Sequence, residues 1–217
     1  MFKQTPLYQP DTTATVTDGW QAAAPVRLAG ATLSDHSTRG KLLIQGAGAP
    51  ALLRRGWQAP ALSPTTGTTL ALGYAFCLRP GRYFLSLPPG EAAAILTALQ
   101  EAWQEEDGPI TITDVTHGRA EIWLQGPAAV HLLSHLCGLD FHPDLFPDLG
   151  AQESSVARTH QLILRHDQEG ERAYALVGPR SLGLYLWQVI IGIGDRGSET
   201  GRPAANPQSP APNPYPT

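Results

Sequence analysis

Two stretches of the chain repeat one another in the type and order of their residues, LSDHSTRGKLLIQG at 33–46 and ITDVTHGRAEIWLQG at 112–126. In each, a Ser or Thr precedes an Asp, another Ser or Thr follows two positions later, and a strand-like run ends in Gln-Gly. Such an internal repeat is typical of a chain that folds as copies of one unit. Two gapped copies are too few for a solenoid, so we expect both units to share one core around a pseudo-two-fold axis.

The residues that follow the first stretch predict a strand, a short helix, a hairpin and a second helix. Leu42 and Ile44 alternate with other side chains, as in a half-buried strand. A short helix is expected over 49–55, and a hairpin over 70–87 turns at an Arg-Pro-Gly-Arg segment. The run 88–107 begins with prolines and has apolar residues at helical spacing, which predicts the closing helix.

The second stretch begins the same order of elements. Two strands over 110–125 enclose a His-Gly turn, and Pro127 opens a helix with a leucine stripe. A hairpin over 160–178 and a helix over 180–190 complete the unit. The pattern predicts an α+β fold with a mainly antiparallel sheet, in which two pseudo-symmetric units of strands, helix, hairpin and helix form one domain.

Composition sets the expected limits of this domain. It is expected to span 33–194, with repeat units at about 33–106 and 109–194. Residues 1–32 lack sustained periodicity, which predicts an arm laid over the domain. Residues 195–217 are rich in Pro, Gly, Asn and Ser, so burial cannot offset their ordering entropy and a disordered tail is predicted. A polyproline ligand for another protein is the alternative interpretation of this tail.

Charge and cysteine content restrict the partners and the compartment. A net charge of -4 and a pI near 5.9 give no general reason to expect binding to nucleic acid or an anionic membrane. The two cysteines, Cys77 and Cys137, suit a reducing compartment. The most apolar run, 182–194, is shorter than the roughly 20 residues that a membrane span needs. We therefore expect a cytoplasmic protein without a nucleic-acid or membrane partner.

A possible metal site comes from histidines on the predicted helix after Pro127. His131 and His135 share a helix face, and Cys137 and His142 follow closely. The glutamate that a zincin helix places after its first histidine is absent, and polar residues beside a leucine stripe are expected on any amphipathic helix. We favour surface histidines and expect no metal.

The Asp of each repeated stretch raises a choice between catalysis and turn capping. Asp114 and Thr116 recur as Asp35 and Ser37 in the first unit. Asp and Thr at a strand end commonly bond to the backbone of a tight turn, and one domain rarely needs two copies of a catalytic site. We favour turn capping and expect no catalytic residue in this chain.

Four segments together carry a resemblance to a known superfamily: TPLY from Thr5, LSDHSTRGKLLIQG, ITDVTHGRAEIWLQGPAA and PRSLGLYLW. Their order resembles the folate-binding superfamily of the glycine-cleavage T-protein, an aminomethyltransferase. Within it, the chain is similar to the gamma subunit of heterotetrameric sarcosine oxidase in length, in TDVTHGRAEIWLQGP and in the closing segment. The resemblance covers most of 5–193. It implies a folate-binding-type fold and either one-carbon transfer to tetrahydrofolate or a part in an oxidase complex.

The resemblance also implies candidate ligand contacts on the second hairpin. T-proteins carry Arg-Thr-Gly-Tyr-Thr-Gly-Glu there, and the glutamate lies at the pterin. The aligned residues match at Arg165, Gly170 and Glu171. Because a carboxylate accepts hydrogen bonds from the paired N–H donors of a pterin, Glu171 and Arg165 are the candidate cofactor-binding residues.

Three departures from the T-protein pattern argue against catalysis by this chain alone. Gln168 stands in place of the tyrosine, and Ala175 in place of the next acidic residue. The first hairpin contains no acid, whereas T-proteins carry a catalytic aspartate in that region. We also expect the separate carboxy-terminal barrel domain of T-proteins to be missing.

The leading hypothesis is a noncatalytic, gamma-like subunit of a heterotetrameric sarcosine-oxidase-type amine oxidase. Such a subunit would pack against larger chains that hold FAD, FMN and NAD, with tetrahydrofolate in a larger folate-binding relative. The first alternative is a stand-alone tetrahydrofolate-binding protein or aminomethyltransferase-like enzyme that uses Glu171 and Arg165. The second is an interaction domain that keeps the fold without oxidase or folate, because fold does not fix function.

Overall fold

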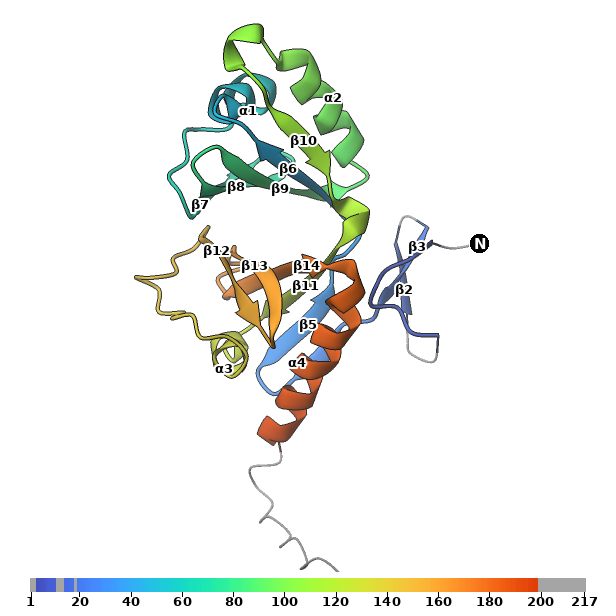
Figure 1. Ribbon diagram of the computed structural model, residues 1–217. Helices are drawn as coiled ribbons and strands as arrows, with labels where there is room; N and C mark the ends of the chain where they lie inside the picture. Colours follow the sequence, from blue (N-terminus) through green and yellow to red (C-terminus); the bar gives the residue numbers. More distant parts are fainter. Residues whose placement is uncertain (1–2, 11–13, 18, 199–217) are drawn as a thin grey trace, which may run out of the picture.

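The computed structural model describes residues 3–10, 14–17 and 19–198, so most of the expected tail, 199–217, lies outside the described residues. Two β-sheets face one another, and helices cover the outer side of each sheet (Figure 1). All strand pairs in the two large sheets are antiparallel. The predicted α+β class is confirmed.

Each unit runs in the order strand, strand, helix, three strands, helix. The first unit consists of β5 (Ala31–Asp35), β6 (Arg39–Gln45), α1 (Ala49–Trp57), β7 (Thr66–Leu70), β8 (Gly73–Arg79), β9 (Arg82–Pro89) and α2 (Ala92–Ala102). The second unit consists of β10 (Thr111–Asp114), β11 (Arg119–Gln125), α3 (Ala129–Ser134), β12 (Ala151–Val156), β13 (Thr159–Arg165), β14 (Ala173–Pro179) and α4 (Gly183–Ser198). This correspondence confirms the prediction of two copies of one unit.

The two units exchange their first strands. The sheets have the strand orders β10-β6-β9-β8-β7 and β12-β13-β14-β11-β5-β4, where β4 is Val26–Leu28. In the first sheet Ile112 of β10 lies opposite Ile44 of β6. In the second, Leu33 of β5 lies opposite Leu124 of β11. Each sheet therefore contains a strand of the other unit, and neither unit can form its complete sheet alone.

In the two large sheets the sequence pattern misses four strands, which are β4, β5, β7 and β12. It predicts one strand from Leu70 to Leu78, whereas the chain turns between Leu70 and Gly73. Gly73 permits this turn, because its φ is +123° and a Cβ there would collide with the carbonyl oxygen of Ser86. Strand β12 has the polar sequence AQESSV and lies at a sheet edge, so it has no apolar run that would reveal it.

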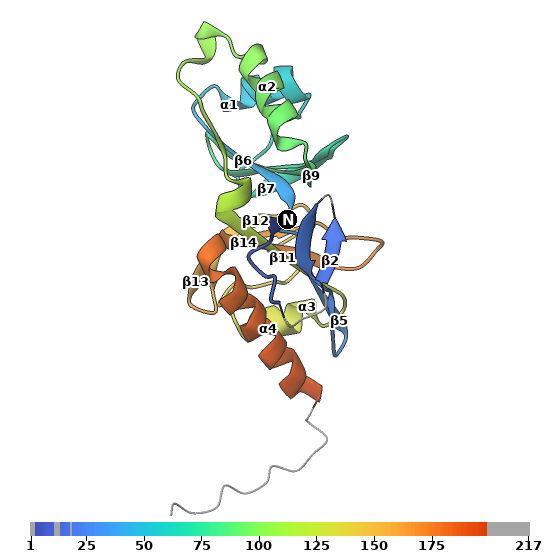
Figure 2. The same ribbon diagram turned by 90° about the vertical axis from the view of Figure 1, so that its right-hand side faces the viewer.

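The N-terminal residues form more structure than an extended arm. Strands β1 (Lys3–Gln4), β2 (Ala14–Thr17) and β3 (Trp20–Ala23) make a separate small sheet, which faces the viewer in Figure 2. Asp35 of β5 ties this region to the domain, because its Oδ2 accepts hydrogen bonds from Oγ1 of Thr5 at 2.6 Å and from the backbone N–H of Ala23 at 3.0 Å. The strands are too short to give a periodic signal in the sequence.

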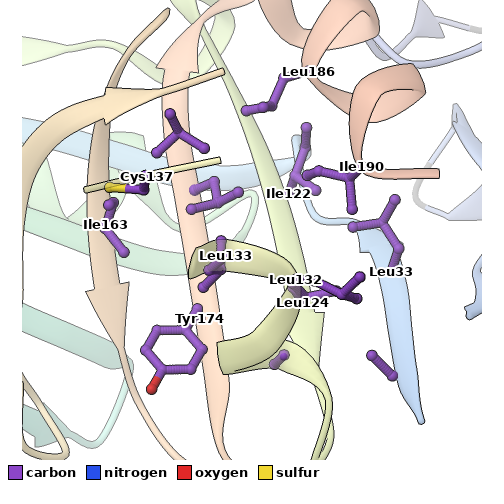
Figure 3. Close-up of a cluster of buried hydrophobic side chains, with 14 of the residues drawn as sticks. Leu33, Ile122, Leu124, Leu132, Leu133, Cys137, Ile163, Tyr174, Leu186 and Ile190 are labelled. Carbon is purple, nitrogen blue, oxygen red and sulfur yellow. The ribbon is translucent and has the colours of Figure 1, made fainter. Parts of the chain in front are cut away.

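Buried apolar side chains form three clusters that follow the layers. One packs the six-stranded sheet against α3 and α4, with Leu33, Leu133 and Ile190 among its members (Figure 3). A second packs the five-stranded sheet against α1 and α2. The third lies between the sheets and includes Phe76 and Trp123. Helix α4 continues through 195–198, which the sequence assigns to the tail.

Within the described residues, no helix combines the length and the apolar character needed to cross a membrane.

Candidate functional site

The Asp of each repeated stretch caps a tight turn at the interface between the sheets. Oδ1 of Asp35 accepts a hydrogen bond from the backbone N–H of Ser37 at 3.0 Å. Oδ1 of Asp114 accepts the equivalent bond from the N–H of Thr116 at 2.8 Å. The prediction that these residues cap turns is confirmed.

The hydroxyl groups of the two capped turns then bond across to the opposite unit. Oγ of Ser37 accepts a hydrogen bond from the backbone N–H of Glu121 on β11 at 3.1 Å. Oγ1 of Thr116 accepts one from the N–H of Lys41 on β6 at 2.9 Å. These reciprocal bonds surround the pseudo-two-fold axis and explain why both stretches carry the same residues.

A lysine and a glutamate meet at equivalent positions of the two repeats. If the two Gln-Gly pairs are superposed, Lys41 falls on Glu121. Nζ of Lys41 lies 3.4 Å from Oε2 of Glu121, and both side chains are 0% exposed. Nζ also donates hydrogen bonds to the backbone oxygens of Ser37 at 3.1 Å and Arg39 at 2.7 Å. The two units are thus joined by a fully buried ion pair with a satisfied cation.

The carboxylate of Glu121 is held mainly through one of its oxygens. Oε1 accepts a hydrogen bond from Nε1 of Trp123 at 2.7 Å and lies 3.5 Å from Nε of Arg39. Burial would raise the pKa of Glu121, but Lys41 and Arg39 outweigh it and hold the pKa below its usual range. Burial lowers the pKa of Lys41, and the nearby carboxylate offsets only part of that effect.

Arg39 extends the charged cluster towards the aromatic rings between the sheets. Its Nε donates a hydrogen bond to Oγ of Ser86 at 2.9 Å. The guanidinium carbon lies 5.7 Å from the ring centroid of Tyr74 and 5.4 Å from that of Trp123. Both distances are in the range of cation–π contacts. Arg39 therefore packs between rings contributed by both units.

Two histidines complete the cluster around Trp123. The His36 ring stacks on Trp123 at a centroid distance of 4.0 Å. The His166 ring meets Trp123 edge-on at 4.3 Å and stacks on Tyr74 at 4.5 Å. Nε2 of Gln168 lies 3.0 Å from Nδ1 of His166. The chain's own side chains thus fill this end of the interface, and the ionised groups bond to one another.

Protonation of His166 should weaken the fold. Burial lowers its pKa from 6.5 to about 4, so the unfolded chain binds more protons than the folded chain between these values. Stability should therefore decrease as the pH falls from 6.5 towards 4. We expect the free energy of unfolding in urea to drop by about 2 kcal/mol between pH 7 and pH 5 through this residue. His166→Phe should remove that part of the drop and keep the ring contacts, whereas Tyr74→Phe should retain it. An unchanged pH dependence in His166→Phe would contradict this assignment.

Of the two candidate folate contacts, Arg165 on β13 is already engaged. Its Nε and Nη2 donate hydrogen bonds to the two carboxylate oxygens of Asp167 at 2.9 and 2.7 Å. Its Nη1 donates to the backbone oxygen of Phe146 at 2.7 Å. The bond to Asp167 raises the pKa of the guanidinium. Arg165 therefore fixes the hairpin to the preceding loop, and ligand binding would have to displace these bonds.

Glu171, the second candidate, lies on the exposed turn of the same hairpin. Its backbone pairs with that of Gln168, whose N–H donates to the Glu171 oxygen at 2.9 Å. The side chain is exposed, in contrast to the buried Arg165. The structure thus places the two candidates in different environments.

Two of the histidines considered for a metal site, His131 and His135, lie close together on the molecular surface. The rings of His131 and His135 are 4.6 Å apart, and Nδ1 of His135 lies 2.8 Å from the backbone oxygen of His131. Among the described residues, no group of three or more His, Cys, Asp or Glu side chains is placed to hold a metal ion.

The buried ion pair is the site that the sequence pattern did not identify. The sequence pattern puts Lys41 on the polar side of a half-buried strand, whereas Lys41 faces Glu121 of the second sheet and is fully buried. Superposing the repeats would have placed a cation and an acid at symmetry-equivalent points. Residues at equivalent positions near a two-fold axis lie close together in space. The internal repeat is therefore the sequence signal from which this ion pair could be predicted.

Comparison with known proteins gives a consistent picture of the fold. Residues 3–205 match the family described as the GCVT N-terminal domain. A heterotetrameric sarcosine oxidase from Corynebacterium sp. U-96, in complex with pyrrole 2-carboxylate, has a chain of similar structure, with a TM-score of 0.67 and 22% identity. The match covers 79% of this chain and 88% of that one.

Two further proteins share part of this likeness. The glycine cleavage system aminomethyltransferase T from Bartonella henselae matches with a TM-score of 0.72 and 18% identity, over 88% of this chain and 58% of that one. The mitochondrial pyruvate dehydrogenase phosphatase regulatory subunit of Mus musculus is 26% identical over 116 residues, or 53% of this chain. The chain spans 13% of the length of this curated relative.

Proposed function

Because the chain belongs to the GCVT N-terminal domain family, we propose that it serves as a noncatalytic, gamma-like subunit of a heterotetrameric sarcosine-oxidase-type amine oxidase. The observation that carries this proposal is that side chains fill the end of the interface around Glu121. Glu121 bonds to Lys41 and Trp123, and the rings of Trp123 and His166 occupy the space between the sheets. An interface end that is occupied by ion-paired and stacked side chains suits a chain that stabilises an assembly.

The extent of the structural matches gives a second support. The match covers 88% of the chain from the Corynebacterium oxidase and 58% of the aminomethyltransferase chain. In a complex of this kind, the larger partner chains would hold FAD, FMN and NAD, and a larger folate-binding relative would hold tetrahydrofolate. This chain would then contribute packing surface, and the complex would be cytoplasmic.

Copurification is the experiment that tests the proposal. The chain is tagged in its native host, and the proteins that copurify with it are identified while flavin absorbance is recorded. We expect a yellow complex with larger chains in fixed stoichiometry. A colourless chain that purifies alone would contradict the subunit proposal and favour an interaction domain unrelated to an oxidase.

The second candidate function is binding of tetrahydrofolate by the chain itself. It is favoured by one observation, the exposed carboxylate of Glu171 at the position where the resemblance puts a pterin contact. The surroundings fit a buried pterin poorly, because Arg165 is bonded to Asp167 and Ala175 is buried among apolar residues. Any folate contact of this chain would therefore be a surface contact at the hairpin.

A titration with tetrahydrofolate separates the two candidates. We expect the isolated chain to show no saturable binding under conditions in which an aminomethyltransferase binds. Saturable binding that Glu171→Ala weakens at least about tenfold would favour the second candidate, since a charge-assisted bond would be lost. Glu169→Ala is the matched control, because Glu169 is an exposed acid on the same turn.

A further inference from the structure

A cavity of about 370 Å³ lies between the two sheets, beside the buried ion pair. It is lined from both units by Leu43, Leu78, Arg82, Phe84, Val115, Arg119, Glu153, His160, Leu162 and Val177. Leu43 and Arg119 lie two residues along their strands from Lys41 and Glu121, and therefore on the same inward faces. The cavity therefore belongs to the same interface as the ion pair. In this part of the interface, stacked aromatic rings do not fill the space between the sheets.

Six of the ten residues that line the cavity are apolar, and they form one part of its wall. Phe84, Leu162 and Val177 belong to the cluster of buried side chains between the sheets. Because these residues come from β9, β13 and β14, both sheets contribute to the wall. A ligand lying there would be held between two apolar surfaces, which favours a flat hydrocarbon body. The volume lies at the lower end of the range for small-molecule sites.

The polar side of the cavity is formed by two guanidinium groups, Arg82 and Arg119, together with Glu153 and His160. Nη1 of Arg82 donates a hydrogen bond to Oε2 of Glu153 at 3.1 Å, and Nε of Arg82 is buried without a hydrogen-bond partner among the described residues. Arg119 makes no ion pair or hydrogen bond within the described part of the chain, although its side chain is only partly exposed. A buried N–H donor without an acceptor costs free energy of folding. A ligand that supplies an acceptor at this point would remove that cost.

We propose that this cavity binds a small carboxylic acid with a flat apolar body, whose carboxylate contacts Arg119 and Nε of Arg82. The acid supplies the missing acceptor, while its apolar part lies between Phe84 and Val177. Guanidinium groups bind carboxylates with two parallel hydrogen bonds, which a neutral ligand of the same shape cannot match. Glu153 compensates the charge of Arg82, so Arg119 remains to balance the ligand. This inference does not depend on the proposed subunit role.

Calorimetric titration of the full chain with naphthalene-2-carboxylate tests the proposal. We expect saturable binding with one ligand per chain and at least tenfold weaker binding of 2-naphthamide, which has the same rings without the charge. Arg119→Gln should weaken binding of the carboxylate at least tenfold and leave the affinity for the amide unchanged. Arg54→Gln, on the exposed side of α1, is the matched control and should bind as the parent does.

The proposal remains testable if the arginine variant does not fold. In the parent chain, the methyl NMR signals of Leu43, Leu162 and Val177 should shift on addition of the carboxylate. No saturable binding of the carboxylate would overturn the proposal. Equal affinities for carboxylate and amide, or shifts confined to methyl groups outside the cavity, would overturn it as well.

Discussion

Replacing Lys41 with methionine is expected to lower the free energy of unfolding by about 3–5 kcal/mol. The side chain is 0% exposed, and its removal leaves the carboxylate of Glu121 buried with Arg39 as its remaining cation at 3.5 Å. A buried charge that loses its closest partner is among the largest single-residue penalties in a folded protein. Urea unfolding of both proteins at pH 7 measures the difference.

A second substitution should recover part of this loss. In Lys41→Met/Glu121→Gln the charge of Glu121 is removed, while the amide oxygen can still accept the hydrogen bond from Trp123. We expect the double variant to be about 2 kcal/mol more stable than Lys41→Met alone. Lys3→Met is the control, because Lys3 is exposed and its loss should change stability by less than about 0.5 kcal/mol. Strictly additive effects would show that the two charges do not interact.

The glycines that end the two repeated stretches should be equally intolerant of a side chain. Gly46 has a φ of +149°, and a Cβ there would lie 2.6 Å from the backbone oxygen of Pro109. Gly126 has a φ of +120°, and a Cβ would lie 2.8 Å from the oxygen of Gly30. Backbone strain of this type costs about 1–3 kcal/mol, and the close contact with a carbonyl adds to it. We expect Gly46→Ala and Gly126→Ala each to destabilise the domain by more than about 2 kcal/mol.

A third glycine provides the control for these two substitutions. Gly138 has no heavy atom within 4 Å of the position of an added Cβ, and its φ is outside the left-handed range. Gly138→Ala should therefore change the free energy of unfolding by less than about 0.5 kcal/mol. If Gly46→Ala were as mild as Gly138→Ala, close packing of the two units at the Gln-Gly positions would not be what preserves the repeat.

The internal repeat carried most of the predictable information about the fold. It predicts two units and one shared core, and the turn-capping roles of Asp35 and Asp114 follow from their recurrence. The reason is physical, because two units related by a pseudo-two-fold axis need the same turn, the same hydroxyl and the same glycine. Local periodicity likewise locates β6, α2 and α4, whose apolar residues recur at regular spacing.

Other elements could not be predicted, because they depend on tertiary contacts that the local sequence of a strand does not reveal. Strand β12 is polar because it lies at the edge of its sheet, and the first residues fold because Asp35 holds Thr5 and Ala23. The partnership of Lys41 with Glu121 requires knowledge of which strand faces which across the interface. The cavity beside Arg119 arises only when both sheets are assembled, so no spacing in the sequence predicts it.

The site residues inferred from family resemblance differ in their surroundings for a similar reason. Arg165 was inferred from a sequence motif, whereas in the structure Asp167 accepts hydrogen bonds from its Nε and Nη2. Which groups accept hydrogen bonds from an arginine can be determined only when interatomic distances are known. The central proposal, a subunit role, therefore rests on how the interface is filled and on which chains accompany this one.

The most direct test of that role is the native mass of the copurifying flavoprotein chains, measured with and without this chain. We predict that the larger chains alone fail to form the heterotetramer, that addition of this chain restores it, and that this chain alone carries no flavin. Assembly of the larger chains into the same complex in its absence would contradict the subunit role.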